Sequence, residues 1–165
     1  MLSINDHSRD SAGMKYVYPV VSRRAGGVSV GINLNVNNAC NWTCIYCQVP
    51  NPKRGGPPPI DLAQLKDELR QFLHEATQGD FLAKNAPPEA RRLVDLGFSG
   101  NGEPTSAEEF SDAIDVAEQV LRDFKLDKLK LRLITNGSLM HRPNVQNGIA
   151  RIGKLNGEIW FKLDR

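Results

Sequence analysis

The sequence of 165 residues lacks any apolar run of the roughly 18–20 residues that a membrane-spanning helix needs. Its first segment, residues 1–7, also lacks the basic and apolar regions of a secretory signal peptide. The net charge of +2 is too small to indicate a nucleic-acid or membrane partner by itself. We therefore expect a cytoplasmic protein without a membrane partner.

Cysteine is absent outside one stretch of eight residues, which holds Cys40, Cys44 and Cys47. No other thiol remains to build a disulfide framework. Such clustering is typical of metal binding or redox use in a reducing compartment, because structural cysteines are scattered along a chain.

The composition, with 40% hydrophobic and 24% charged residues, is that of a globular protein with one core. We expect residues 1–27 to form an N-terminal lead-in with a short strand near residues 16–21, and residues 28–165 to form the core. Residues 121–165 carry 10 basic and 4 acidic side chains. We interpret this bias as solvated helix faces and loops, with a basic rim for an anionic substrate as the alternative.

Hydrophobic periodicity alternates along the chain between period two and the helical period. It predicts strands at residues 28–36, 93–98, 129–134 and 158–164. Helices are predicted between them: the first follows the N-cap Asp61, the second opens with a capping box of Ser106 and Glu109, and the third follows Pro143. This alternation predicts an α/β fold of four parallel strands and three helices. In such folds the loops after the strands line one rim.

Three thiolates spaced Cys-x3-Cys-x2-Cys leave one metal position unfilled. A zinc ion would take its fourth ligand from His7, His74 or His141. A [4Fe-4S] cluster would keep one iron free for a small ligand with amine and carboxylate groups. Both remain open on spacing alone, and the spacing favours the cluster.

The stretch Cys40-Asn-Trp-Thr-Cys44-Ile-Tyr46-Cys47 resembles the Cys-x3-Cys-x-aromatic-Cys signature of the radical S-adenosylmethionine (radical SAM) enzymes. The resemblance implies that the three cysteines hold a [4Fe-4S] cluster whose fourth iron binds S-adenosylmethionine. It also implies reductive cleavage of this cofactor to a 5'-deoxyadenosyl radical, which abstracts hydrogen from a substrate. Tyr46 would lie near the adenine.

A second motif fits the same resemblance. The loop Gly100-Asn101-Gly102-Glu103-Pro104 follows the second predicted strand, where the family carries a Gly-Gly-Glu loop that receives the methionine ammonium. Glycine permits close approach of the backbone to a ligand, and a carboxylate suits an ammonium. Asn101 replaces one glycine of the family pattern.

The resemblance also assigns cofactor contacts to Asn136, after the third strand, and to Lys162 and Asp164 in the fourth. Lys162 and Asp164 share a strand face with Trp160. If this face is outside the barrel, the two charges form a cross-strand pair instead.

The family resemblance implies a partial (β/α) barrel, truncated after four of six units. It further implies an electron donor such as flavodoxin or ferredoxin. The loop residues look most like an iron-sulfur oxidoreductase branch related to wybutosine-forming tRNA-modifying enzymes, with tRNA or a peptide or protein as substrate. The alternative from another class is a non-catalytic zinc-binding module that uses the three cysteines and a histidine.

Overall fold

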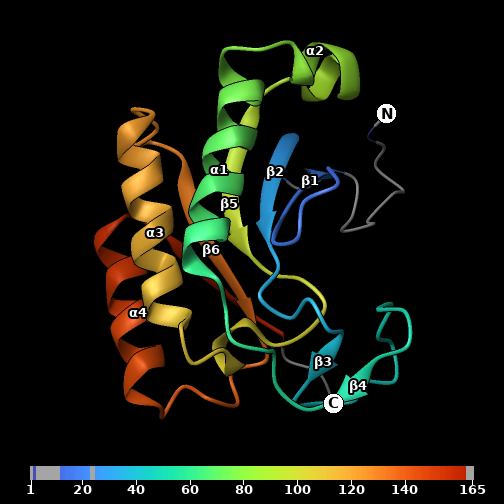
Figure 1. The fold of residues 1–165 in the computed structure, drawn as a ribbon, viewed down its shortest axis with the longest axis vertical. Helices are drawn as coiled ribbons and strands as arrows, with labels where there is room; N and C mark the ends of the chain where they lie inside the picture. The colour runs from blue at the N-terminus through green and yellow to red at the C-terminus, as the bar shows by residue number, and fades with distance from the viewer. Residues whose placement is uncertain (1, 3–11, 23–24, 163–165) are drawn as a thin grey trace.

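The computed structural model describes residue 2, residues 12–22 and residues 25–162. Within these residues the chain is an α/β protein with a mostly parallel sheet (Figure 1). The strands are β1 Val17–Ser22, β2 Gly27–Ile32, β3 Ala39–Cys40, β4 Lys53–Arg54, β5 Leu93–Phe98, β6 Lys130–Thr135 and β7 Glu158–Phe161. The helices are α1 Leu62–Thr77, α2 Phe81–Asn85, α3 Phe110–Asp123 and α4 Pro143–Lys154, with short 3-10 turns η1 Pro88–Ala90 and η2 Pro104–Ser106. No described helix is both long enough and apolar enough to traverse a bilayer.

The main sheet has the strand order β1-β2-β5-β6-β7. Strands β2, β5, β6 and β7 are parallel and adjacent in chain order, and β1 pairs antiparallel with β2. This hairpin confirms the short strand expected before the core. The four parallel strands and the three long helices between them are likewise as predicted.

The helices α1, α3 and α4 lie side by side over one face of the sheet (Figure 1). Their buried stripes pack on alternate strand residues such as Val30, Leu96 and Leu133, which are fully buried. Since each connection returns the chain to the next strand in line, every helix lands on the same face. The sheet therefore has one apolar, helix-covered face.

The opposite face, called here the polar sheet face, carries Ser29, Asp95, Arg132 and Glu158. The apolar side chains of Val20, Ile134 and Trp160 lie beside them. The carboxylate of Asp95 accepts hydrogen bonds from the Ser29 hydroxyl and pairs with Arg132, and Arg132 also bonds to Glu158 at 3.0 Å. This face is held together across three strands by charge pairing.

The first strand ends earlier than the alternating pattern indicates. It was expected to reach Val36, but β2 stops at Ile32. The side chain of Asn33 accepts a hydrogen bond from the backbone N–H of Asn35 at 3.1 Å. Such a local bond turns the backbone away from the strand ladder. Leu34 remains buried, which explains why the apolar alternation continues past the strand.

One of the two helix caps predicted from the sequence is present in the structure. Asp61 accepts from the Gln64 N–H at 3.0 Å and caps α1, as predicted. The capping box of Ser106 and Glu109 is wrong: Ser106 lies in η2, its hydroxyl donates to the Glu103 carbonyl at 2.6 Å, and α3 begins only at Phe110. Residues 107–109, which the pattern assigned to the first turn of the helix, follow η2 and lie outside α3.

A buried carboxylate ties the lead-in to the core. Glu68 of α1 accepts hydrogen bonds from the backbone N–H groups of Lys15, Tyr16 and Val17, at 3.1, 2.7 and 3.2 Å. It also accepts from the Gln64 side-chain amide at 3.0 Å, and Glu68 is 8% exposed. Glu68 therefore fixes the entry of β1 against α1.

Candidate functional site

The cysteine loop lies at the carboxyl ends of the parallel strands, as expected. It begins at β3, which pairs with β4 through Ala39 opposite Lys53 and Cys40 opposite Arg54. Figure 1 shows β3 and β4 beyond the end of β2. The Cys40 carbonyl also accepts from the Gly55 N–H at 2.9 Å. Cys40 is thus part of a small second sheet.

The other two cysteines lie on the tip of this loop. Cys44 is half-buried and Cys47 is exposed, and all three thiols are free. The tip also presents Ile45 and Tyr46, with 98% and 51% exposure. In the part of the chain that the structure describes, no three Cys, His, Asp or Glu side chains are grouped closely enough to hold a metal ion.

The stem of the cysteine loop is rich in asparagine. Asn35 donates to the Ala39 carbonyl at 2.9 Å, and Asn38 accepts from the Asn101 amide at 2.7 Å. The backbone N–H of Asn101 also donates to Asn33 at 3.1 Å. These bonds join the cysteine-loop stem to the glycine loop that follows β5.

At two glycines of that loop, neighbouring residues leave no room for a Cβ atom. A Cβ atom added at Gly100, whose φ is +154°, would lie 2.3 Å from the Asn33 amide oxygen. One added at Gly102 would lie 2.2 Å from the Ala39 carbonyl oxygen. The sequence suggested close approach of a ligand; in the structure the close approach is made by the cysteine-loop stem.

Glu103 is buried, with 3% exposure. Its carboxylate accepts from the hydroxyls of Thr105 and Thr135, both at 2.6 Å. It also accepts from the backbone N–H groups of Thr105 at 3.2 Å and Asn136 at 2.7 Å. The carboxylate therefore joins the glycine loop to the end of β6, and its oxygens are already engaged within the chain.

Asn136 faces the cysteine loop. Its amide nitrogen donates to the Asn41 side-chain oxygen at 3.0 Å, and its amide oxygen accepts from Ser138. Lys162 is exposed, and its backbone N–H donates to the Thr135 carbonyl at 2.9 Å. Asp164 lies outside the described residues. The structure thus brings Asn136 and Glu103 close to Cys40 and places Lys162 after the end of β7.

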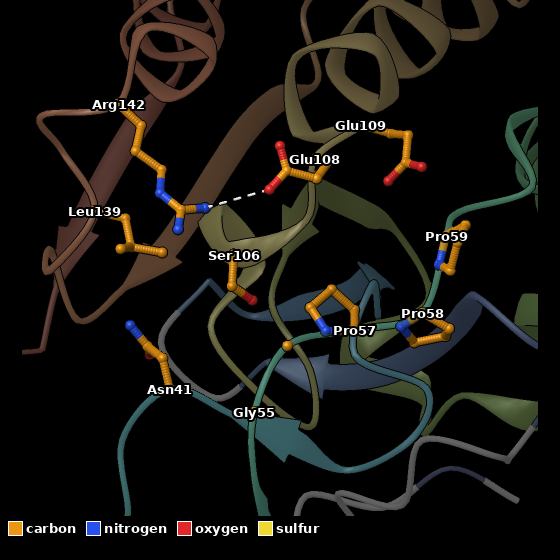
Figure 2. A pocket seen from close by; sticks show the side chains of 11 residues that line it. Asn41, Gly55, Pro57, Pro58, Pro59, Ser106, Glu108, Glu109, Leu139 and Arg142 are labelled. Carbon is orange, nitrogen blue, oxygen red and sulfur yellow. Dashed lines mark ion pairs between the residues drawn. The ribbon is translucent and has the colours of Figure 1, made fainter.

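A pocket of about 380 Å³ borders the cysteine loop at Asn41 (Figure 2). Its walls come from the proline-rich segment 57–59, from Ser106 and Glu108 before α3, and from Leu139 and Arg142 before α4. Arg142 pairs with Glu108 across the pocket at 3.7 Å. The sequence offered no signal for Glu108 or Arg142, because they meet only when both helices pack on the same sheet face.

A second hollow, of about 400 Å³, lies on the polar sheet face over Gly97. Arg132 stacks on the ring of Trp160 at 4.7 Å, and the Trp160 indole N–H donates to Glu158 at 3.2 Å. Hydrogen bonds from Lys130 and then Arg132 lower the pKa of Glu158 from its usual 4.5 to about 2. Glu158, beside the hollow, is therefore ionised and paired at neutral pH.

Comparisons with known proteins give two kinds of relative, UPF0026 proteins and a protein named GTPase Obg. The chain is 30% identical over 133 residues to a UPF0026 protein of Helicobacter pylori and 28% identical over 155 residues to one of Methanocaldococcus jannaschii. These alignments cover 79% and 89% of this chain but only 37% and 43% of those proteins. A protein named GTPase Obg, from Brachyspira hyodysenteriae, is 26% identical over 131 residues, which is 17% of its length.

No protein-family model matches the chain, and no solved structure matches it. The chain spans less than half the length of the curated relatives it matches. The similarity therefore points to the UPF0026 proteins and to a shared segment within longer chains.

Proposed function

We propose that this chain carries the first part of a radical SAM core, built as a partial (β/α) barrel of four parallel strands. The observation that supports this most is the position of three free thiols, Cys40, Cys44 and Cys47, in one loop at the carboxyl edge of the sheet. Ligand sites of parallel α/β folds are built on this edge. The Cys-x3-Cys-x-Tyr-Cys spacing accounts for the choice of a [4Fe-4S] cluster.

The strand order supports the barrel. A doubly wound sheet reverses its strand order and places helices on both faces. Here the parallel strands follow in chain order, and α1, α3 and α4 share one face. A sheet of this kind closes by adding units at its open edge beyond β7. The greater length of the relatives is compatible with further units.

The donor set fits the cluster in its chemistry. Cys40, Cys44 and Cys47 would supply three thiolates, and S-adenosylmethionine would complete the fourth iron. When bound, the cluster and cofactor supply reductive cleavage to a 5'-deoxyadenosyl radical. Tyr46 and the segment Gly100–Glu103 would line the cofactor, together with Asn136, Lys162 and Asp164. Because the Glu103 carboxylate is engaged within the chain, backbone carbonyls of the glycine loop are better placed to receive an ammonium.

A GTPase function is not carried over from the Obg-named relative. The chain contains no Gly-x4-Gly-Lys-Ser/Thr segment, the loop that binds nucleotide phosphates. The alignment also covers only 17% of that protein.

Anaerobic reconstitution with iron and sulfide tests the proposal. We expect four irons per chain, a visible absorption that bleaches with dithionite, and release of 5'-deoxyadenosine from S-adenosylmethionine. Cys44→Ala should lose the cluster, whereas Thr43→Ala in the same loop should keep it. Tight binding of one zinc per chain without this product would favour the zinc-binding module and refute the enzyme.

We propose two substrate classes: tRNA, if the chain belongs to the branch related to wybutosine-forming enzymes, and a peptide or protein, if it belongs with other members that share the core. Binding of tRNA would weaken steeply between 50 mM and 200 mM salt, because phosphate contacts release counterions. A neutral peptide would show little salt dependence. Flavodoxin or ferredoxin is the proposed electron donor, and replacing dithionite with either reduced protein tests it.

A further inference from the structure

Three side chains form a closed ring of hydrogen bonds beside Cys40. The Asn41 amide nitrogen donates to the Ser138 hydroxyl at 2.7 Å, and this hydroxyl donates to the Asn136 amide oxygen at 2.7 Å. The Asn136 amide nitrogen closes the ring by donating to the Asn41 oxygen at 3.0 Å. Asn41 is 95 residues from Asn136 in the chain. The ring therefore ties the cysteine loop to the loop after β6.

Each polar atom in the ring has a complementary partner. Turning one amide alone by 180° would set the two amide nitrogens against each other. The Ser138 backbone N–H, which donates to the Asn136 amide oxygen at 3.0 Å, opposes turning both together, so both amides have one favourable orientation. In that orientation the Asn41 oxygen also lies 3.8 Å from the Cys40 sulfur. The ring thus restrains the residue next to the first thiol in both position and orientation.

The ring is attached to two buried residues. Thr135 at the end of β6 and Glu103 are 1% and 3% exposed, and Glu103 holds the Thr135 hydroxyl and the Asn136 N–H. Asn136 is therefore fixed at its backbone by a carboxylate and at its side chain by the ring. A buried, fully paired network of this kind rigidifies the groups attached to it.

The other thiols have fewer restraints. The bond from the Cys47 N–H to the Cys44 carbonyl, at 3.1 Å, stays within the tip itself. Cys40 by contrast is held by the ring, by β4 and by the Gly55 N–H. The cysteine loop therefore has one anchored thiol, Cys40, and two thiols on its tip, of which Cys47 is exposed and Cys44 is half-buried.

We infer that Asn41, Asn136 and Ser138 are positioning residues that fix Cys40 at the sheet edge, so that the tip brings Cys44 and Cys47 to it. In this assignment the side-chain amide of Asn136 holds the cysteine loop through Asn41. The inference deepens the proposed function and rests on it for the identity of the metal group. The anchoring of Cys40 itself is a property of the metal-free chain and is tested there.

The experiment measures how fast iodoacetamide alkylates each cysteine of the reduced, metal-free chain, by mass spectrometry of the peptides. We expect Asn41→Ala, Asn136→Ala and Ser138→Ala each to speed Cys40 alkylation about threefold to tenfold, the effect of losing one or two modest hydrogen bonds. Cys44 and Cys47 should change less than about twofold, since the ring does not contact them. The double variant of Asn41 and Asn136 should equal either single variant.

Two controls separate anchoring from general stability. Ser138→Thr keeps the hydroxyl and should restore the slow Cys40 rate. Asn144→Ala removes an asparagine whose amide donates to the carbonyls of Ala107 and Glu108, and it should leave all three rates unchanged. Unchanged Cys40 rates in the ring variants, or equal acceleration of all three thiols, would overturn the inference.

Iron reconstitution of the same variants connects the ring to the cluster. We expect Asn136→Ala to load iron but to lose it to a chelator several times faster than wild type. If wild type takes up no cluster, the proposed function fails. The alkylation rates still show whether the ring anchors Cys40. If Asn136→Ala speeds Cys40 alkylation but retains iron as well as wild type does, the role of the ring in holding the cluster is overturned.

Discussion

Replacing Glu103 should test whether its carboxylate supports the fold or waits for a ligand. In Glu103→Ala four donors lose their acceptor: two threonine hydroxyls and the backbone N–H groups of Thr105 and Asn136. The hydroxyls can rotate to other acceptors, whereas the two N–H groups cannot. Each buried group left unpaired costs about 1–3 kcal/mol. The expected loss in free energy of unfolding is therefore about 2–6 kcal/mol.

Urea denaturation followed by fluorescence and circular dichroism measures this loss. With an m-value of about 2 kcal/mol/M, the midpoint should fall by about 1–3 M. Glu103→Gln should fall less, because one oxygen still accepts while the nitrogen faces the Asn136 N–H. The control Glu108→Gln removes an exposed charge and should change the midpoint little. A Glu103→Ala midpoint within about 0.2 M of wild type would refute this reasoning. It would favour the alternative that the carboxylate binds a ligand.

Three further variants test other contacts. Glu68→Ala leaves three backbone N–H groups without an acceptor and should lower the free energy of unfolding by about 3 kcal/mol or more in urea titrations, whereas exposed Glu75→Ala on the same helix should not. Gly102→Ala should cost about 1–3 kcal/mol by the same assay, because the added methyl meets the Ala39 carbonyl, while Gly56→Ala has free space and should be neutral. Because the pKa of Glu158 is lowered, its ion pairs stabilise the fold above pH 4.5 and are lost as the pH falls toward about 2. The difference in free energy of unfolding between wild type and Glu158→Gln should therefore shrink across this range. A constant difference would contradict the pairing.

Local patterns in the sequence predicted the elements well where burial alone decides them. The strand at residues 93–98 was predicted with the bounds that β5 has, because an apolar run is a local property. The end of β2 was missed, since Leu34 continues the apolar alternation while Asn33 turns the backbone. Periodicity does not register a side chain that competes with the strand ladder.

The sequence suggests residues for the candidate site, whereas their contacts come only from the structure. The cysteine spacing and the glycine loop were visible in the sequence, yet the partners of Glu103 lie up to 33 residues away and those of Asn41 up to 97. One signal was present and unused: five asparagines fall between residues 33 and 41. Such a density of amides indicates a hydrogen-bonded stem, because asparagine satisfies backbone groups where no regular element does.

The hollow over the polar sheet face has a practical consequence at Gly97. A methyl group placed there would meet nothing closer than the Ser29 hydroxyl at 3.8 Å and the Asp95 carboxylate at 3.9 Å, which are ordinary contacts. Larger side chains at this position would extend into the empty volume instead of into the core. A large side chain at residue 97 would therefore block access to this face of the sheet and leave the cysteine loop unchanged.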